Sequence, residues 1–170
     1  MKAIIGVIIA ALVGGLVYLK FFASDFTVEY RDEFYAVVKT VTVDTANSTN
    51  QIEATFNEIL QIYSPKAQTG IVRTIGVNES EFTFQVGYLI KADDEEVPES
   101  MEIVTIPAGT VAELTVYGPY TESYKSFPTL IEKIKESDLE VSGPAYQLFF
   151  DDPALVSEPS LRAALVFPVE

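Results

Sequence analysis

The chain has 170 residues, enough for one domain and an additional segment, and carries 25 acidic against 11 basic side chains. Its net charge of −14 would repel phosphate backbones, so nucleic acid is not expected as a partner. The lack of cysteine and histidine excludes disulfides, thiol or imidazole catalysis, and zinc sites built from those residues.

The first segment, residues 3–19, is uncharged and almost wholly apolar, with Lys2 before it and Lys20 after it. About 17 helical residues rise about 25 Å, so we predict one transmembrane anchor over residues 1–23. A cleaved signal peptide and a buried core helix are the alternatives, although residues 20–24 (KFFAS) form a poor cleavage site. The flanking lysines give a slight positive-inside bias, which favours a domain on the periplasmic or extracytoplasmic side.

The first half of the remaining chain predicts a β-α-β-β unit. Residues 24–31 are a polar, extended lead-in. Residues 34–43 (FYAVVKTVTV) are rich in β-branched and aromatic side chains, as is typical of a strand. A helix carrying Ile52, Phe56, Ile59, Leu60 and Tyr63 at helical spacing follows, and then strands over 70–77 and 81–90.

Residues 91–100 (KADDEEVPES) join the two halves of the chain. The acidic run within them lacks the spaced oxygen ligands and the turn glycine of a calcium loop. We therefore predict a solvated linker, and neither a metal site nor a bound cofactor.

The second half begins with a regular strand pattern. Residues 111–117 alternate in side-chain polarity with the period of a strand, and Gly118-Pro119 ends it. Apolar residues at helical spacing then predict a helix over 120–134. Within this helix, Pro128 either lies in the first turn of a helix that restarts after Ser126 or kinks a continuous one.

Two further strands, over residues 145–150 and 161–169, complete a second unit in the same order. The halves align Lys39 with Glu113 and Gly70 with Gly143, which indicates an internal repeat.

The predicted fold is α+β, a tandem βαββ repeat preceded by one transmembrane helix. The domain covers residues 24–170, with repeat one over about 27–90 and repeat two over about 101–170. Two such units would place two antiparallel sheets side by side, with helices on one face and a cleft on the other.

An ordered series of residues also resembles a known family, the GyrI-like small-molecule-binding domain. The series comprises Gly109, Ala112, Gly118-Pro119-Tyr120, Gly143-Pro144, Asp152-Pro153, Leu161-Arg162 and Phe167-Pro168-Val169. The resemblance is good over 106–170 and weaker over 27–90. It implies the architecture above and a cleft that binds small molecules, in a domain that occurs alone or as the effector module of multidrug-responsive regulators. In this family the strand before Asp-Pro commonly reads Glu-x-Tyr, and its glutamate binds ligands or acts in catalysis.

The family glutamate and tyrosine correspond to Gln147 and Phe149 in this chain. If the alternate apolar residues of strand 111–117 pack on the helices, its other side chains face the cleft, together with those two positions. We therefore predict a ligand-binding site made of Glu113, Thr115, Tyr117, Gln147 and Phe149, and no catalytic residue.

Neutral Gln147 favours a neutral, partly aromatic ligand unless Glu113 supplies a charge, which Lys39, its partner in the repeat alignment, would neutralise. Ordinary packing or an ion pair is the alternative role for each of these residues.

Three functions follow from these observations. The first is a membrane-tethered, non-catalytic domain that binds a small hydrophobic molecule or a protein segment. The second is a hydrolase of strained small molecules, which the resemblance implies for members that retain the glutamate. The third is a membrane-anchored adaptor for protein partners.

Overall fold

The computed structural model describes residues 25–44, 48–65, 69–78, 80–91 and 97–170. The predicted transmembrane anchor and residues 92–96 of the predicted linker lie outside the described residues. None of the described helices is long and apolar enough to cross a membrane.

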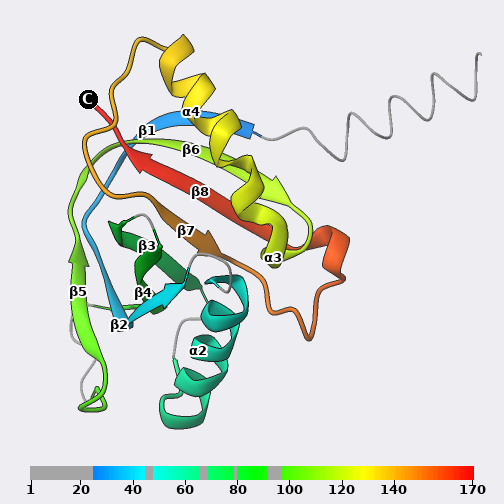
Figure 1. The fold of residues 1–170 in the computed structure, drawn as a ribbon. Helices are drawn as coiled ribbons and strands as arrows, with labels where there is room; N and C mark the ends of the chain where they lie inside the picture. The colour runs from blue at the N-terminus through cyan, green and yellow to red at the C-terminus, as the bar shows by residue number, and fades with distance from the viewer. Residues whose placement is uncertain (1–24, 45–47, 66–68, 79, 92–96) are drawn as a thin grey trace, which may run out of the picture.

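Eight strands of the described chain form one continuous antiparallel sheet in the order β1-β6-β8-β7-β3-β4-β2-β5. The sheet is strongly curled (Figure 1). The strands are β1 (Asp25–Arg31), β2 (Phe34–Asp44), β3 (Gly70–Val77), β4 (Glu81–Ile90), β5 (Glu102–Ile106), β6 (Gly109–Tyr117), β7 (Tyr146–Phe149) and β8 (Arg162–Pro168).

The α+β class is confirmed, but the prediction of two separate sheets is wrong. Strand β7 pairs with β3 over four residues, from Tyr146 opposite Arg73 to Phe149 opposite Gly70. This pairing joins the halves into one sheet. It gives hydrogen-bonding partners to the backbone N–H and C=O groups that β3 and β7 would otherwise expose along an edge.

The two halves exchange their first strands. Strand β1 precedes the first βαββ unit but pairs with β6 of the second. Strand β5 precedes the second unit but pairs with β2 of the first. Read outward from the centre, the halves are therefore β7-β8-β6-β1 and β3-β4-β2-β5. Neither edge strand was predicted, because exposed edges tolerate charged residues that obscure the apolar pattern.

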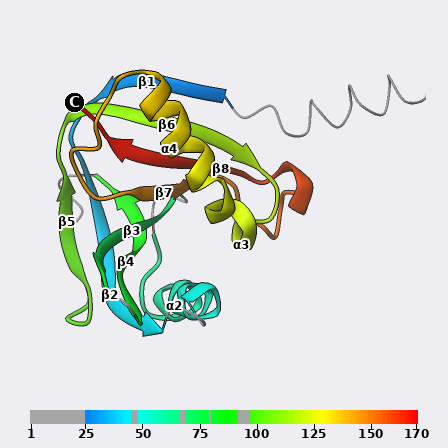
Figure 2. The same cartoon turned by 45° about the horizontal axis from the view of Figure 1, so that its top comes forward.

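The helices lie together on one face of the sheet, α2 over one half and α3 and α4 over the other (Figures 1 and 2). They span Ser48–Ile62 (α2), Tyr120–Ser123 (α3) and Phe127–Glu136 (α4), with a short 3₁₀ turn between α3 and α4. Pro128 lies in the first turn of α4, where its missing N–H costs no helical hydrogen bond. Of the two alternatives for this proline, the restarted helix is therefore correct.

Two clusters of buried apolar side chains pack α2 and α4 against the sheet. Ile59 of α2 packs with Val72 and Val86, and Leu130 of α4 packs with Leu114 and Leu165. The face opposite the helices, called the inner face below, carries its own core from six strands. That core comprises Ala36, Val38, Ile71, Ile106, Val111, Tyr146, Leu148, Ala164 and Val166.

The apolar stripe expected on helix α2 is only partly buried against the sheet. Within the stripe Ile59 is fully buried, and Thr55, which lies outside the stripe, is buried as well. Leu60 is 51% exposed and Phe56 is only partly buried. The difference arises because one flank of α2 borders an open pocket rather than strands.

Candidate functional site

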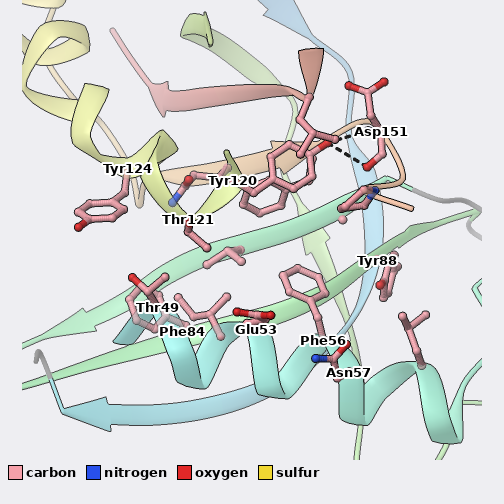
Figure 3. Close-up of a pocket in the computed structure, with 18 of the residues that line it drawn as sticks. Thr49, Glu53, Phe56, Asn57, Phe84, Tyr88, Tyr120, Thr121, Tyr124 and Asp151 are labelled. Carbon is pink, nitrogen blue, oxygen red and sulfur yellow. Dashed lines mark hydrogen bonds between the residues drawn. The ribbon is translucent and has the colours of Figure 1, made fainter. Parts of the chain in front are cut away.

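A pocket of about 1230 Å³ lies between α2 and α3, and is called the interhelical pocket below (Figure 3). Its floor is formed by outward-facing residues of β3, β4 and β7, and its rim by the loop that follows β7. It therefore lies on the helix-bearing face of the sheet. The prediction of a cleft on the opposite face is wrong, because that face is filled by the inner core.

Four aromatic rings form a continuous chain across the pocket. Phe56 of α2 lies edge-on to Tyr88 at 5.5 Å and to Phe149 at 6.0 Å between ring centroids. The ring of Phe149 lies 4.8 Å from that of Tyr120 on α3. These contacts link the two helices through the sheet, and they leave ring faces and edges available to a ligand.

Gly70 allows two of these rings to meet. A Cβ atom at this position would lie 3.3 Å from Phe56 Cε1 and 3.5 Å from Phe149 Cβ. Any larger residue would therefore separate the two rings or fill the floor of the pocket.

The charged side chains that line the pocket are all acidic among the described residues. They are Glu53 from α2 and Asp151, Asp152 and Glu158 from the loop after β7. Glu53 lies along the side of α2 that borders the pocket in Figure 3, and its carboxylate has no hydrogen-bonding or ionic partner within the described part of the chain. Burial raises the pKa of Tyr88 above its ordinary value, and the negative charge of Asp152 adds to the effect.

The two aspartates also shape the rim. Asp151 Oδ2 accepts a hydrogen bond of 2.7 Å from the backbone N–H of Arg162, and Asp152 Oδ1 accepts one of 2.8 Å from the N–H of Ala154. The loop is thus held by its own carboxylates, which also line the pocket.

Tyr120 ties α3 to the same loop. Its hydroxyl accepts a hydrogen bond from the backbone N–H of Asp151 at 2.8 Å and lies 2.9 Å from the carbonyl oxygen of that residue (Figure 3). Burial raises the pKa of the Tyr120 phenol, which stays neutral and hydrogen-bonded near neutral pH.

The structure divides the five predicted ligand-binding residues between the two faces of the sheet. Gln147 and Phe149 line the interhelical pocket. Glu113, Thr115 and Tyr117 lie on the inner side of β6, away from it. Cross-strand pairing explains the division, because Gln147 is opposite Leu165, and Leu165 is opposite Leu114 rather than Glu113.

On the inner face, Glu113 forms an ion pair instead of facing a ligand. Its Oε2 accepts a hydrogen bond of 2.6 Å from Arg31 Nη2, and its Oε1 lies 3.3 Å from Thr115 Oγ1. Burial lowers the pKa of the Arg31 guanidinium, but hydrogen bonds to Glu113 and Glu29 outweigh burial and raise it overall. Tyr117 is 51% exposed at the end of its strand.

Lys39 does not neutralise Glu113 either. It lies on the helix-bearing face and pairs with Glu58 of α2. The repeat alignment of Lys39 with Glu113 therefore joins residues that occupy opposite faces of the sheet.

The pocket residues that the sequence analysis missed come from α2, β3, β4, the segment from α3 to the start of α4, and the loop after β7. The sequence spacing of three of these residues on α2 could have indicated the pocket. Phe56 and Leu60 lie on the same flank of the helix as Glu53, so a carboxylate within an apolar stripe pointed to a partly open face.

A model of the family described as the GyrI-like small molecule binding domain matches residues 24–170. A search of curated proteins finds no match. The C-terminal domain of EcmrR is similar in structure, with a TM-score of 0.66 and 13% sequence identity over 88% of this chain and 99% of that chain.

Two further solved structures are similar. SAV2435 bound to tetraphenylphosphonium has a TM-score of 0.63 and 9% identity, with 86% of this chain and 94% of that chain covered. A hydrolase from Listeria innocua has a TM-score of 0.53 and 10% identity, with 90% and 96% covered. At these identities the solved structures establish a shared fold.

Proposed function

The chain belongs to the GyrI-like small molecule binding domain family, and from this premise we propose that its interhelical pocket binds a small hydrophobic organic cation without altering it chemically. One observation carries the proposal. A continuous chain of aromatic rings shares the pocket with acidic side chains, and no basic side chain lines it among the described residues.

Aromatic and acidic groups favour the same class of ligand for different reasons. Ring faces supply apolar contact area and attract cations through their quadrupoles. Carboxylates such as Glu53 and Glu158 add a negative potential, which concentrates cations at the mouth of the pocket. The structure of the similar protein SAV2435 with tetraphenylphosphonium supports this choice, since that ligand is a lipophilic cation.

Binding without catalysis is favoured by the residue at the family's glutamate position. Gln147 lines the pocket there, and a neutral amide cannot serve as a general base. The negative charge in this pocket instead comes from α2 and from the loop after β7, at Glu53, Asp151, Asp152 and Glu158. These rim positions suit the attraction of a cation better than the activation of water at the pocket floor.

The proposal is tested by isothermal titration calorimetry of tetraphenylphosphonium against the full chain in phosphatidylcholine nanodiscs, with empty nanodiscs subtracted. Glu53→Gln should weaken binding by about two- to fivefold, the range for one solvent-exposed charge pair. Glu113→Gln is the matched control, because it removes the same charge on the opposite face and should leave affinity unchanged.

Neutral triphenylphosphine oxide should bind more weakly than the cation to the wild-type chain and should not respond to Glu53→Gln. If the wild-type chain bound neither compound, the small-ligand proposal would be wrong, and a protein segment would become the favoured occupant.

For the location of the domain, we propose that residues 1–23 hold it at a membrane, on the periplasmic or extracytoplasmic side. The support is the uncharged apolar run between Lys2 and Lys20.

A further inference from the structure

The Gln147 amide at the floor of the interhelical pocket is held by a buried serine. Ser123 of α3 is 7% exposed, and its Oγ lies 2.9 Å from Gln147 Oε1 and 2.8 Å from the backbone carbonyl oxygen of Tyr120. Both of these neighbours are acceptors in that arrangement. A hydroxyl group has one proton, so it cannot make a full hydrogen bond to both.

Exchanging the oxygen and nitrogen positions of the Gln147 amide gives a hydrogen-bonding partner to the amide, to the Ser123 hydroxyl and to the Tyr120 carbonyl oxygen. The Gln147 NH₂ then donates to Ser123 Oγ, and the Ser123 hydroxyl donates to the carbonyl oxygen of Tyr120. Because Ser123 is buried, a hydrogen bond left unmade there would cost the desolvation of a polar group, so the fully bonded arrangement is the more stable one. In it the Gln147 carbonyl oxygen is at the end of the amide that does not contact Ser123, on a side chain that lines the interhelical pocket.

We propose that Ser123 fixes the Gln147 amide with its oxygen toward the ligand, so that the pocket selects protonated amines over quaternary cations of similar size. This inference rests on the proposed function and specifies its ligand. A carboxylate attracts any cation through its charge. An amide group is neutral, so its oxygen stabilises a bound ligand mainly by accepting a hydrogen bond from an N–H that points at it. Gln147 is thus the acceptor, and Ser123 is a positioning residue.

The rim carboxylates do not remove this selectivity. Glu53 and the loop acids attract both kinds of cation through long-range charge, which is insensitive to whether the nitrogen carries a proton or a methyl group. Discrimination therefore depends on the directional hydrogen bond at the floor, beside the Phe149 and Tyr120 rings.

A matched pair of ligands tests the inference. Protonated N-methyldibenzylamine and dibenzyldimethylammonium have the same two rings and the same charge, and differ by N–H against N–CH₃. Their affinities for the full chain in phosphatidylcholine nanodiscs are measured by titration calorimetry at pH 7. The wild-type chain should prefer the protonated amine by about tenfold, as expected for one hydrogen bond to a charged donor.

Three variants separate positioning from folding. Ser123→Ala should reduce the preference to below about threefold, because the amide is free to rotate, and Ser123→Thr, which keeps the hydroxyl, should restore it. Gln147→Leu should abolish the preference while both ligands still bind through the aromatic rings. The preference is a ratio of two affinities for the same sample, so partial unfolding does not change it.

Equal affinity of the wild-type chain for both ligands, or a preference that survives in Gln147→Leu, would overturn the inference while leaving the proposed function intact. Failure of both ligands to bind would overturn the two together.

Discussion

Tyr146 lies at the inner face of the sheet with 2% of its surface exposed, and its hydroxyl accepts a hydrogen bond of 3.4 Å from Arg31 Nη1. Its ring packs edge-on against Phe34 at 5.9 Å. Burial raises the pKa of this phenol, while the positive charge of Arg31 partly opposes the shift. A single residue therefore couples the inner core to the ion pair that Arg31 forms with Glu113.

This shift predicts an alkaline limit to stability. The folded-state pKa of Tyr146 lies above the unfolded value of about 10. The neutral phenol therefore makes its full contribution to the free energy of unfolding below that pH, and this contribution is lost as the pH rises further. The free energy of unfolding should therefore fall above about pH 10, and Tyr146→Phe should make the fall shallower. Tyr88 and Tyr120 shift in the same direction, so the fall should not vanish.

Urea denaturation at intervals between about pH 8 and pH 11 measures this effect. At pH 8, the difference in the free energy of unfolding between Tyr146→Phe and the wild-type chain gives the separate cost of losing the hydrogen bond to Arg31. Parallel pH profiles for the variant and the wild-type chain would mean that Tyr146 does not cause the alkaline loss.

At the scale of one element, helix α2 performs two tasks with neighbouring residues. Ile59 is fully buried against Val72 and Val86 of the sheet. Leu60, the next residue, lines the interhelical pocket and is half exposed. The same helix also presents Glu53 and Phe56 to the pocket, so its rotation about its own axis sets both stability and ligand contact.

The two tasks predict opposite outcomes for two alanine substitutions. Ile59→Ala should lower the free energy of unfolding by about 2–5 kcal/mol, because it leaves a cavity beneath the helix. Leu60→Ala should cost less than about 1 kcal/mol but weaken tetraphenylphosphonium binding about threefold through lost apolar contact.

Chemical denaturation and calorimetric titration of both variants provide the comparison. A large loss of stability in Leu60→Ala, with binding unaffected, would show that α2 is rotated differently and that the pocket has another wall.

At the scale of the whole molecule, the exchange of edge strands makes the two halves interdependent. Strand β1 covers the edge of β6 and also delivers Arg31 to Glu113 of the other half. The predicted anchor precedes β1 directly in the sequence, so any membrane attachment would reach the domain at the outer edge of its second half.

The anchor gives the last prediction. The full chain should remain in the membrane pellet after carbonate extraction, because residues 3–19 supply an uncharged span of sufficient length. A chain that begins at Asp25, and so retains β1, should appear in the supernatant. Recovery of a mature chain beginning near Ser24 from the soluble fraction of cells that express the full sequence would instead indicate a cleaved signal peptide.

The sequence by itself determined the local elements of this protein. Six of the eight strands and the principal helices follow from periods of two and about 3.6 residues, together with the breaks at Gly118-Pro119 and Gly143-Pro144. These are short-range properties, set by side-chain spacing and backbone dihedrals within about ten residues. The ordered residues of the second half were also enough to suggest the family, whose model matches the chain from residue 24 to residue 170.

Only the tertiary structure decided which faces of these elements meet. Alternation along β6 and β7 assigns residues to two sides of each strand, but the relative phase of two strands depends on their hydrogen-bonded register. The observed register differs by one residue from the register that would place Gln147 and Glu113 on the same face. Gln147 therefore lies on the helix-bearing face, and Glu113 lies on the inner face. The carboxylate of Glu53 and the loop acids enter the pocket through long-range packing of α2, α3 and the sheet, which no local pattern records.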